Sequence, residues 1–412
     1  MINLNCHSIY SYGRSIAKIE DIAKKAIELG EKTFCISDLD SFSSLKKASS
    51  IAEEFNLKLI PGYEAKIKPE FEFNKFSIEN ELASLNRIVR LKRTSKEEKE
   101  EALLKINDLN KKLKIAKNFF TTTFVAKNQK GFSEIIDIYN SEKLYGDDYL
   151  VDFDSFNDRK FNHSIAILGL DSSVFYFFKN MDNIDDKNKF IEKINFYKEK
   201  FGNNLYFKID TTFVDSQKAL EDNNALIRLA RENNIKFIIS NDIRYVNKEN
   251  RNDYRLYRNI VTGDIERYDS DNNYIMSEDE FLSYATNLGY SLSDLNEALE
   301  NNRAIEESAE NFKFPIAPSL INCEKQLRDL CEIGFNKLRK GTKYEEESRK
   351  RLEYELSVIN EKNFSQYFIK VYNITKVAYE NNILMGPGRG SAGGCEVCFL
   401  LGIIKIDPLK YG

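Results

Sequence analysis

Histidines, cysteines and long apolar runs are all scarce in this sequence of 412 residues, and each scarcity excludes a class of protein. With only two histidines, the closely spaced Cys395 and Cys398 lack further zinc ligands, because structural zinc sites need four. The six cysteines are scattered in a chain far larger than disulfide-stapled scaffolds, which indicates reduced thiols. No stretch approaches the roughly 18 apolar residues of a membrane span, and the N-terminus has no signal-peptide pattern. We therefore expect a cytoplasmic protein without membrane contact.

An excess of positive charge is also missing. The chain has 61 Lys and Arg against 65 Asp and Glu, a formal net charge of −4. Proteins that bind nucleic acid usually carry a basic footprint, so any DNA contact must be local. Hydrophobic residues make up 42% of the chain, which is ample for folded domains. A chain this long exceeds one ordinary core, so we expect two or three domains.

The first part of the chain alternates between strand and helix patterns. Strands joined by helical crossovers are expected to be parallel, so this part predicts an α/β fold, either barrel-like or a wound sheet. The predicted strands are 2–8, 32–37, 57–67, one ending near 126, 162–170, 204–210 and 236–240, and the predicted helices are 19–29, 44–55, one after Gly131 and 223–233.

A polar, strongly helical stretch at 77–118 interrupts this pattern. Apolar residues recur at helical spacing in its second half, and Ser95 followed by Glu98 has the form of a capping box. We predict two antiparallel helices that project as an insertion. They are either a solvated charged hairpin without function or an arm that contacts DNA or a partner.

Helices dominate the rest of the chain, and the change of pattern predicts three regions. These are an α/β domain at 1–270, a helical connector at 271–380 and a C-terminal region at 381–412. The predicted helices are 277–285, 293–311, 323–338, 345–360 and 366–382.

The densest glycine cluster lies near the C-terminus. A predicted strand at 383–385 leads into 386–394, which reads Gly-Pro-Gly-Arg-Gly-Ser-Ala-Gly-Gly, and an apolar run follows. Glycines let a backbone take positive φ and present its N–H groups to phosphate, while arginine and serine add further donors. The spacing matches neither a Walker A loop nor a dinucleotide-binding motif. From these residues alone, the segment is either a polyphosphate site or a structural turn.

A longer resemblance begins at this point. The segment RLEYELSVINEKNFSQYFIKVYNITKVAYENNILMGPGRGSAGG, followed by LGIIKIDPLKYG, closely resembles the junction that leads into the palm of bacterial C-family replicative DNA polymerases, the alpha-subunit family of DNA polymerase III. FVAKNQKGFSEII and ISNDIRYVNKENRNDYRLYRNIVTGD resemble the family more loosely and in the same order. The opening hundred residues resemble its polymerase-and-histidinol-phosphatase (PHP) domain, apart from the insertion. The resemblance covers essentially the whole chain and implies a barrel-like (βα) PHP domain, a helical region and the start of a nucleotidyltransferase-type palm.

The resemblance assigns the triphosphate of an incoming deoxynucleotide to the glycine-rich loop. Gly388, Arg389, Gly390 and Ser391 would bind it, and Arg389 would neutralise charge on the leaving pyrophosphate. The chain departs from the family after Ala392, where a carboxylate at Glu396 is expected to repel a phosphate one helical turn away.

The catalytic aspartates of the family come shortly after its Asp-Pro-Leu segment. This sequence ends at Gly412, before any such pair, so we expect no catalytic residue in it and no polymerisation by this chain alone. Mg²⁺ would act with the complete polymerase. The implied partners are the remainder of the polymerase with its palm aspartates, primed template DNA and dNTP, and they could include the sliding clamp and other replisome proteins.

The metal cluster of an active PHP domain is depleted in this sequence. Of the family's ligands, only four remain, and arginine stands at 244 where the last histidine should be. Because neutral imidazoles give such clusters their affinity, we expect no tightly bound metal. His163 is expected to be an ordinary, partly buried histidine. The remaining ligands are His7, Asp38, Glu64 and Asp242.

Two other functions are compatible with the sequence. One is a metal-dependent phosphoesterase or proofreading activity of the N-terminal domain, against which the lost histidines argue. The other is a non-catalytic module that binds DNA or a replisome partner through its helical region, which the acidic charge balance makes less attractive.

Overall fold

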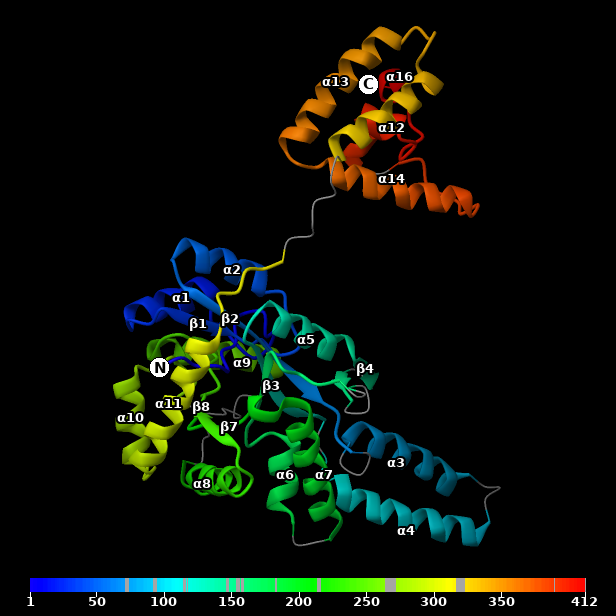
Figure 1. Ribbon diagram of the computed structural model, residues 1–412. Coiled ribbons are helices and arrows are strands. Elements are labelled where there is room, and N and C mark those ends of the chain that lie inside the picture. The colour runs from blue at the N-terminus through cyan, green and yellow to red at the C-terminus, as the bar shows by residue number, and fades with distance from the viewer. Residues whose placement is uncertain are drawn as a thin grey trace. The chain divides into compact units, whose positions relative to one another are not determined.

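The computed structural model in Figure 1 divides the chain into two compact units, Met1–Phe314 (unit 1) and Pro315–Gly412 (unit 2). Within the part that the structure describes, no helix is long and apolar enough to cross a membrane. The described residues are 1–70, 74–91, 95–113, 116, 118–145, 148–152, 156, 159–181, 184–212, 216–263, 272–315, 323–388 and 390–411.

Unit 1 is built on a mixed sheet that curls into a barrel. The parallel pairing of the first two strands confirms the crossover prediction, whereas β3 is antiparallel to both of its neighbours. The short strands β4 (Glu142–Tyr145) and β5 (Asp148–Val151) extend the far end of β2. The barrel strands, in spatial order, are β1 (Thr33–Ile36), β2 (Lys58–Ile67), β3 (Phe120–Ala126), β6 (Ser164–Leu168), β7 (Leu205–Ile209) and β8 (Lys236–Ile239).

The N-terminal segment closes the barrel between its first and last strands. The carbonyl of Cys6 accepts from Ser37 N at 2.9 Å, beyond β1, and His7 N donates to Ile243 O at 3.1 Å, beyond β8. The strand predicted at 2–8 is reduced to an isolated bridge between Cys6 and Ile243. That prediction was wrong in length because the segment only touches its neighbours where the barrel closes.

The barrel interior changes from apolar to polar along the strands. One buried cluster takes a residue from each barrel strand, including Ile60 of β2 and Tyr206 of β7. Side chains alternate faces along a strand, so the same faces next present Glu64 and Lys208. The polar end therefore lies at the carboxyl ends of the parallel strands, where barrel enzymes place their sites.

Helices cover the outside of the barrel and extend unit 1 beyond the predicted boundary at 270. Asn302 of the last helix donates its side-chain amide to Ile2 O at 3.0 Å and Ile239 O at 2.8 Å, which fixes this helix to β8. The compact unit that contains this helix ends at Phe314. The helices are α1 (Ile19–Glu28), α2 (Leu45–Glu54), α5 (Gln129–Asn140), α6 (Ser173–Lys179), α7 (Ile184–Phe201), α8 (Ser216–Glu232), α9 (Arg251–Thr262), α10 (Glu278–Asn287) and α11 (Leu292–Ser308), with short 3₁₀ turns at Gly202–Asn204 and Lys248–Asn250.

The predicted insertion is a helical hairpin of α3 (Lys75–Arg90) and α4 (Lys96–Leu113), which projects from the rest of unit 1 (Figure 1). The capping box forms as expected, because Glu98 N donates to the Ser95 hydroxyl and Ser95 N donates to the Glu98 carboxylate. The hairpin has a small core of its own, made by Ile78, Leu82, Leu85, Ala102 and Leu109.

All the regular elements in the described part of unit 2 are helices. The strand predicted at 383–385 is wrong, because the segment is irregular and Leu384 is 96% exposed. A single strand needs a neighbour for its backbone groups, and the described part of unit 2 offers none. The elements are α12 (Cys323–Leu338), α13 (Glu345–Glu361), α14 (Ser365–Glu380), the 3₁₀ segment Gly390–Gly394, α15 (Glu396–Leu400) and α16 (Pro408–Tyr411).

Candidate functional sites: the polar end of the barrel and the glycine-rich loop

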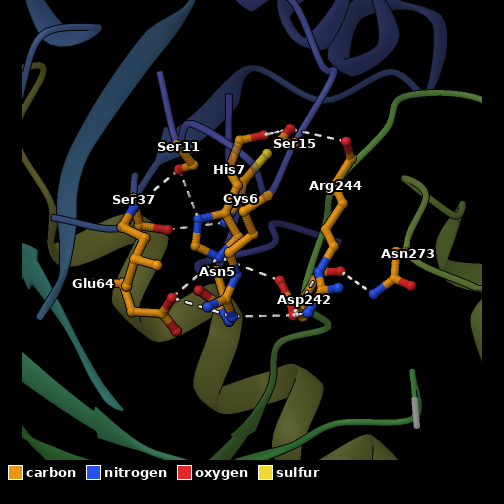
Figure 2. Close-up of polar contacts among 12 residues, drawn as sticks. Asn5, Cys6, His7, Ser11, Ser15, Ser37, Glu64, Asp242, Arg244 and Asn273 are labelled. Atoms are coloured by element: carbon orange, nitrogen blue, oxygen red, sulfur yellow. Dashed lines mark hydrogen bonds and ion pairs between the residues drawn. The ribbon is translucent and has the colours of Figure 1, made fainter. Parts of the chain in front are cut away.

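The structure brings all four predicted remnant ligands into one network at the polar end of the barrel. The imidazole of His7 lies between two carboxylates, with Nε2 at 3.4 Å from Glu64 Oε2 and 3.2 Å from Asp242 Oδ1 (Figure 2). On its other side, Nδ1 is 3.1 Å from the hydroxyl of Ser11, which also donates to Asp38 at 2.7 Å. His7, Asp38 and Glu64 have no exposed surface.

Two arginines neutralise the carboxylates that flank His7. One terminal nitrogen of Arg14 lies 3.3 Å from Glu64 Oε2 and 3.2 Å from Asp242 Oδ2. Arg244 donates to Asp242 Oδ2 from two nitrogens, at 3.0 and 2.7 Å, and to the Tyr254 hydroxyl at 2.7 Å. Burial opposes ionisation of Asp242, but these two guanidinium groups outweigh it and hold the pKa of Asp242 well below its usual value.

Asp38 is engaged by the protein rather than directed toward His7. Its Oδ1 accepts from Ser8 N at 2.6 Å and from the Ser11 hydroxyl, and its Oδ2 accepts from the Ser8 hydroxyl at 2.8 Å. The carboxylate therefore holds the turn that follows the N-terminal segment.

A buried lysine adds a third cation at this end of the barrel. Lys208 of β7 is 3% exposed, and Gly169 gives it room, because a Cβ on that residue would come within 2.3 Å of the lysine Cε. Burial opposes protonation of Lys208, but Asp171 and Asp210 raise its pKa. Burial likewise opposes ionisation of Asp171, but Lys208 holds its pKa below the usual value. Burial also raises the pKa of Asp210 to about 6.

The residues present do not fit the metal cluster of an active PHP domain. One histidine remains, Asp38 is saturated by hydroxyl and amide donors, and Arg14 bridges the two other carboxylates. A guanidinium at this distance repels a metal cation and competes for the same oxygens. Within the described ranges, no group of three or more His, Cys, Asp or Glu could hold a metal ion.

Sequence reasoning missed Arg14, Lys208 and Asp171. Arg14 lies in a loop with no periodic pattern, so nothing local marks it. The position of Lys208 was predictable from the sequence, because strand alternation places it on the same face as Tyr206 and Asp210 of an otherwise apolar strand. A buried lysine needs an acidic partner, and that requirement could have indicated Asp171.

The glycine-rich loop of unit 2 exposes most of the predicted triphosphate residues. Gly388 has φ of 143° and Gly390 has φ of 64°, so both occupy backbone conformations that favour glycine. Gly388, Gly390 and Ser391 are all exposed. Arg389, the fourth predicted residue, lies outside the described residues.

The structure does not support the expectation that Glu396 repels a phosphate at the loop. Glu396 is fully buried, and Arg339 donates to both of its carboxylate oxygens at 2.8 Å. The Ser348 hydroxyl donates to Oε1 at 2.6 Å. The charge is thus paired inside unit 2 and does not face the loop as an isolated anion.

A second carboxylate occupies the N-terminus of α15. Glu355 accepts from Glu396 N at 3.1 Å and from Val397 N at 2.9 Å, and Arg351 donates to it at 2.7 Å. Helix N-termini attract anions, and here the protein supplies its own. The N-terminal amides of α15 at Glu396 and Val397 are therefore already engaged by a carboxylate of the protein.

Cys395, Cys398 and His163 each make a polar contact with another residue of the protein. The Cys395 thiol donates to Glu355 Oε2 at 3.1 Å, and Cys398 N donates to Cys395 Sγ at 3.4 Å. His163 is half-buried, with Nδ1 3.4 Å from the side-chain nitrogen of Asn128. These contacts are structural.

Two sequence models of known protein families match parts of this chain. The sequence model of the PHP domain matches residues 3–212, just over half of the chain. The chain belongs to the PHP domain family. A second model, the bacterial DNA polymerase III alpha NTPase domain, matches residues 325–412, which include the glycine-rich loop.

Similar proteins match this PHP-domain chain over its full length. DNA polymerase III subunit alpha of Borreliella burgdorferi is 27% identical over 431 residues, which cover 100% of this chain and 33% of the relative. The corresponding subunit of Aquifex aeolicus is 25% identical over 432 residues, covering 100% of this chain and 34% of the relative. The chain is thus homologous to the N-terminal part of these subunits and spans about a third of their length.

Among solved structures, an amidohydrolase from Chromobacterium violaceum aligns with a TM-score of 0.27 and 9% identity over 59% of this chain and 87% of that chain. A likeness this low carries no functional weight.

Proposed function

We propose that this chain contributes the triphosphate-binding loop to template-directed DNA synthesis, as the N-terminal portion or a split subunit of a replicative DNA polymerase of the DNA polymerase III alpha type. Full-length similarity to such subunits, with the PHP and polymerase matches in the same chain, is the observation that carries the proposal. Its partners would be the remainder of the polymerase with the palm aspartates, primed template DNA and dNTP. Mg²⁺ would act in the complete enzyme.

The glycine-rich loop has the chemistry that this role needs. Gly388 and Gly390 let backbone amides approach phosphate oxygens closely, and the exposed Ser391 hydroxyl can donate. The proposal assigns to Arg389 a bidentate grip on the triphosphate, which suits a planar guanidinium. Pairing of the buried Glu396 with Arg339 supports it further, because this carboxylate is not left as an unpaired anion beside the loop.

The N-terminal barrel would serve this polymerase as a structural domain. Arg14 and Arg244 contact the carboxylates that metals hold in active PHP domains, and Lys208 adds positive charge beside them. These three cations, of which Arg244 and Lys208 are buried and Arg14 is partly buried, would substitute for the charge of a metal cluster and keep the strand ends together.

Nucleotide-dependent thermal stabilisation of the full chain tests the proposal. Saturating Mg-dNTP should raise the melting temperature, because a ligand at 100 times its Kd stabilises by about 2.7 kcal/mol. Arg389→Ala should abolish the shift, whereas Arg328→Ala, at an exposed arginine of α12 paired with Glu353, should keep it. Absence of any shift, or an equal shift in both variants, would contradict the triphosphate role.

A further inference from the structure

One buried arginine connects both ends of the glycine-rich loop. Arg339 directly follows α12 and is 2% exposed. Besides its two hydrogen bonds to Glu396, it donates from Nη1 to Asp407 Oδ2 at 2.8 Å and from Nη2 to Asp407 Oδ1 at 2.7 Å. A single guanidinium therefore holds two carboxylates, each through two hydrogen bonds. Burial opposes its charge, but Glu396 and Asp407 raise the pKa of Arg339.

The two carboxylates lie close in sequence to residues at the two ends of the glycine-rich loop. Glu396 begins α15, two residues after Gly394, where the 3₁₀ segment of the loop ends. Asp407 lies two residues after Lys405, whose backbone N donates to Pro387 O at 2.7 Å, at the start of the loop. Movement of either carboxylate would therefore be passed to one end of the loop.

The surroundings of Arg339 fix its position. Its guanidinium lies 4.6 Å from the ring centroid of Phe399 in α15. Helix α12 crosses α15 so closely that a Cβ on Gly334 would come within 2.0 Å of Leu400 O. Asp407 in turn accepts from Leu409 N at 3.0 Å, which caps α16. The Arg339 guanidinium and its two carboxylates are thus attached to α12, α15 and α16, which are packed or bonded together and cannot shift independently.

We propose that Arg339 is a positioning residue for the triphosphate loop, acting through Glu396 and Asp407 rather than by touching nucleotide. The proposal rests on the proposed function, because the bound nucleotide is the ligand assigned above. It explains why a buried arginine is needed: lysine would keep the charge but lacks the planar fork that grips two carboxylates at once.

The sequence offers a single reporter inside the loop. Arg389–Gly390 is the one place in the sequence where glycine follows arginine. Labelling arginine with ¹³C at the carbonyl and glycine with ¹⁵N therefore selects the amide of Gly390 alone in an NMR spectrum of the full chain. The test compares wild type, Arg339→Lys and the control Arg328→Lys, with and without Mg-dATP.

The proposal predicts that Arg339→Lys moves or splits the Gly390 resonance before nucleotide is added, and weakens Mg-dATP affinity by about tenfold. Arg328→Lys should match wild type in both measurements. An unchanged Gly390 resonance together with wild-type affinity in folded Arg339→Lys would overturn the proposal. Should this variant fail to fold, Asp407→Asn removes one charge from the fork at a carboxylate that is 21% exposed, and the same readouts apply.

The nucleotide site and the positioning role of Arg339 are refuted by different outcomes. If wild type gives no nucleotide-dependent shift at Gly390, the proposed function is refuted, while the comparison without nucleotide still decides whether Arg339 positions the loop. If wild type responds and folded Arg339→Lys matches it in both the Gly390 resonance and the Mg-dATP affinity, the positioning role is refuted and the nucleotide site stands.

Discussion

Removing the guanidinium of Arg14 should destabilise unit 1 far more than removing an exposed arginine that bridges two carboxylates in the same way. Arg14 is 17% exposed at its side chain, and it contacts Glu64 and Asp242, which are 0% and 11% exposed. Breaking a buried pair by deleting one partner leaves an uncompensated charge and typically costs about 3–5 kcal/mol. Arg14→Met keeps the apolar stem, so its cost would report mainly the lost charge.

The expected cost converts into a measurable change of melting temperature. Unfolding entropy is about 2.1 cal/mol/K per residue near 60 °C. For a unit that spans Met1–Phe314, a loss of about 3–5 kcal/mol corresponds to a fall of about 5–8 °C. The assay is differential scanning calorimetry of the full chain, in which the transition of unit 1 is followed.

Arg231 supplies the matched control. It contacts both Asp294 and Glu297, but it is 54% exposed at its side chain. Exposed pairs contribute about 0–1 kcal/mol, so Arg231→Met should change the melting temperature by less than about 2 °C. Adding Glu64→Gln to Arg14→Met should recover part of the loss, since it removes the orphaned charge. Equal effects of Arg14→Met and Arg231→Met would refute the reasoning.

Two other predictions address the edge of the sheet and the loop. Burial, assisted by Asp40, raises the pKa of Glu142 from 4.5 to about 7, so the folded state binds this proton more tightly than the unfolded chain. Unfolding free energy should therefore fall as pH rises from about 4.5 to 7, and denaturant titrations should show a flatter profile for Glu142→Gln. Gly388→Ala should destabilise unit 2 by about 1–3 kcal/mol, because φ is 143° and the new Cβ would lie 3.0 Å from Ile404 Cγ2. Gly393→Ala, where nothing lies within 4 Å of the added Cβ, should be tolerated in the same thermal denaturation.

Periodic elements were predictable from the sequence because their pattern is local. The bounds of α12, Cys323–Leu338, agree with the prediction, and the capping box of α4 forms as its residues indicate. The antiparallel direction of β3 and the irregular 383–385 were not predictable, since both depend on which neighbours the tertiary fold supplies.

The candidate sites were predictable only in part, for the same reason. The resemblance identified His7, Asp38, Glu64 and Asp242, and the structure brings them together. The cations beside them come from a loop and from a strand far along the chain, so only the fold reveals the charge balance. Glu396 shows the converse case, because a carboxylate that looks repulsive in sequence is paired with a buried arginine 57 residues away.

Calorimetric titration of Mg-dATP into the full chain tests the central claim most directly. If the loop grasps the phosphates, wild type should bind the nucleotide, inorganic tripolyphosphate should compete with it, and Gly388→Ala should weaken binding while Gly393→Ala does not. Two results would contradict the assignment of a triphosphate site to this loop. One is that folded wild type does not bind Mg-dATP; the other is that tripolyphosphate fails to compete and both glycine variants bind Mg-dATP equally well.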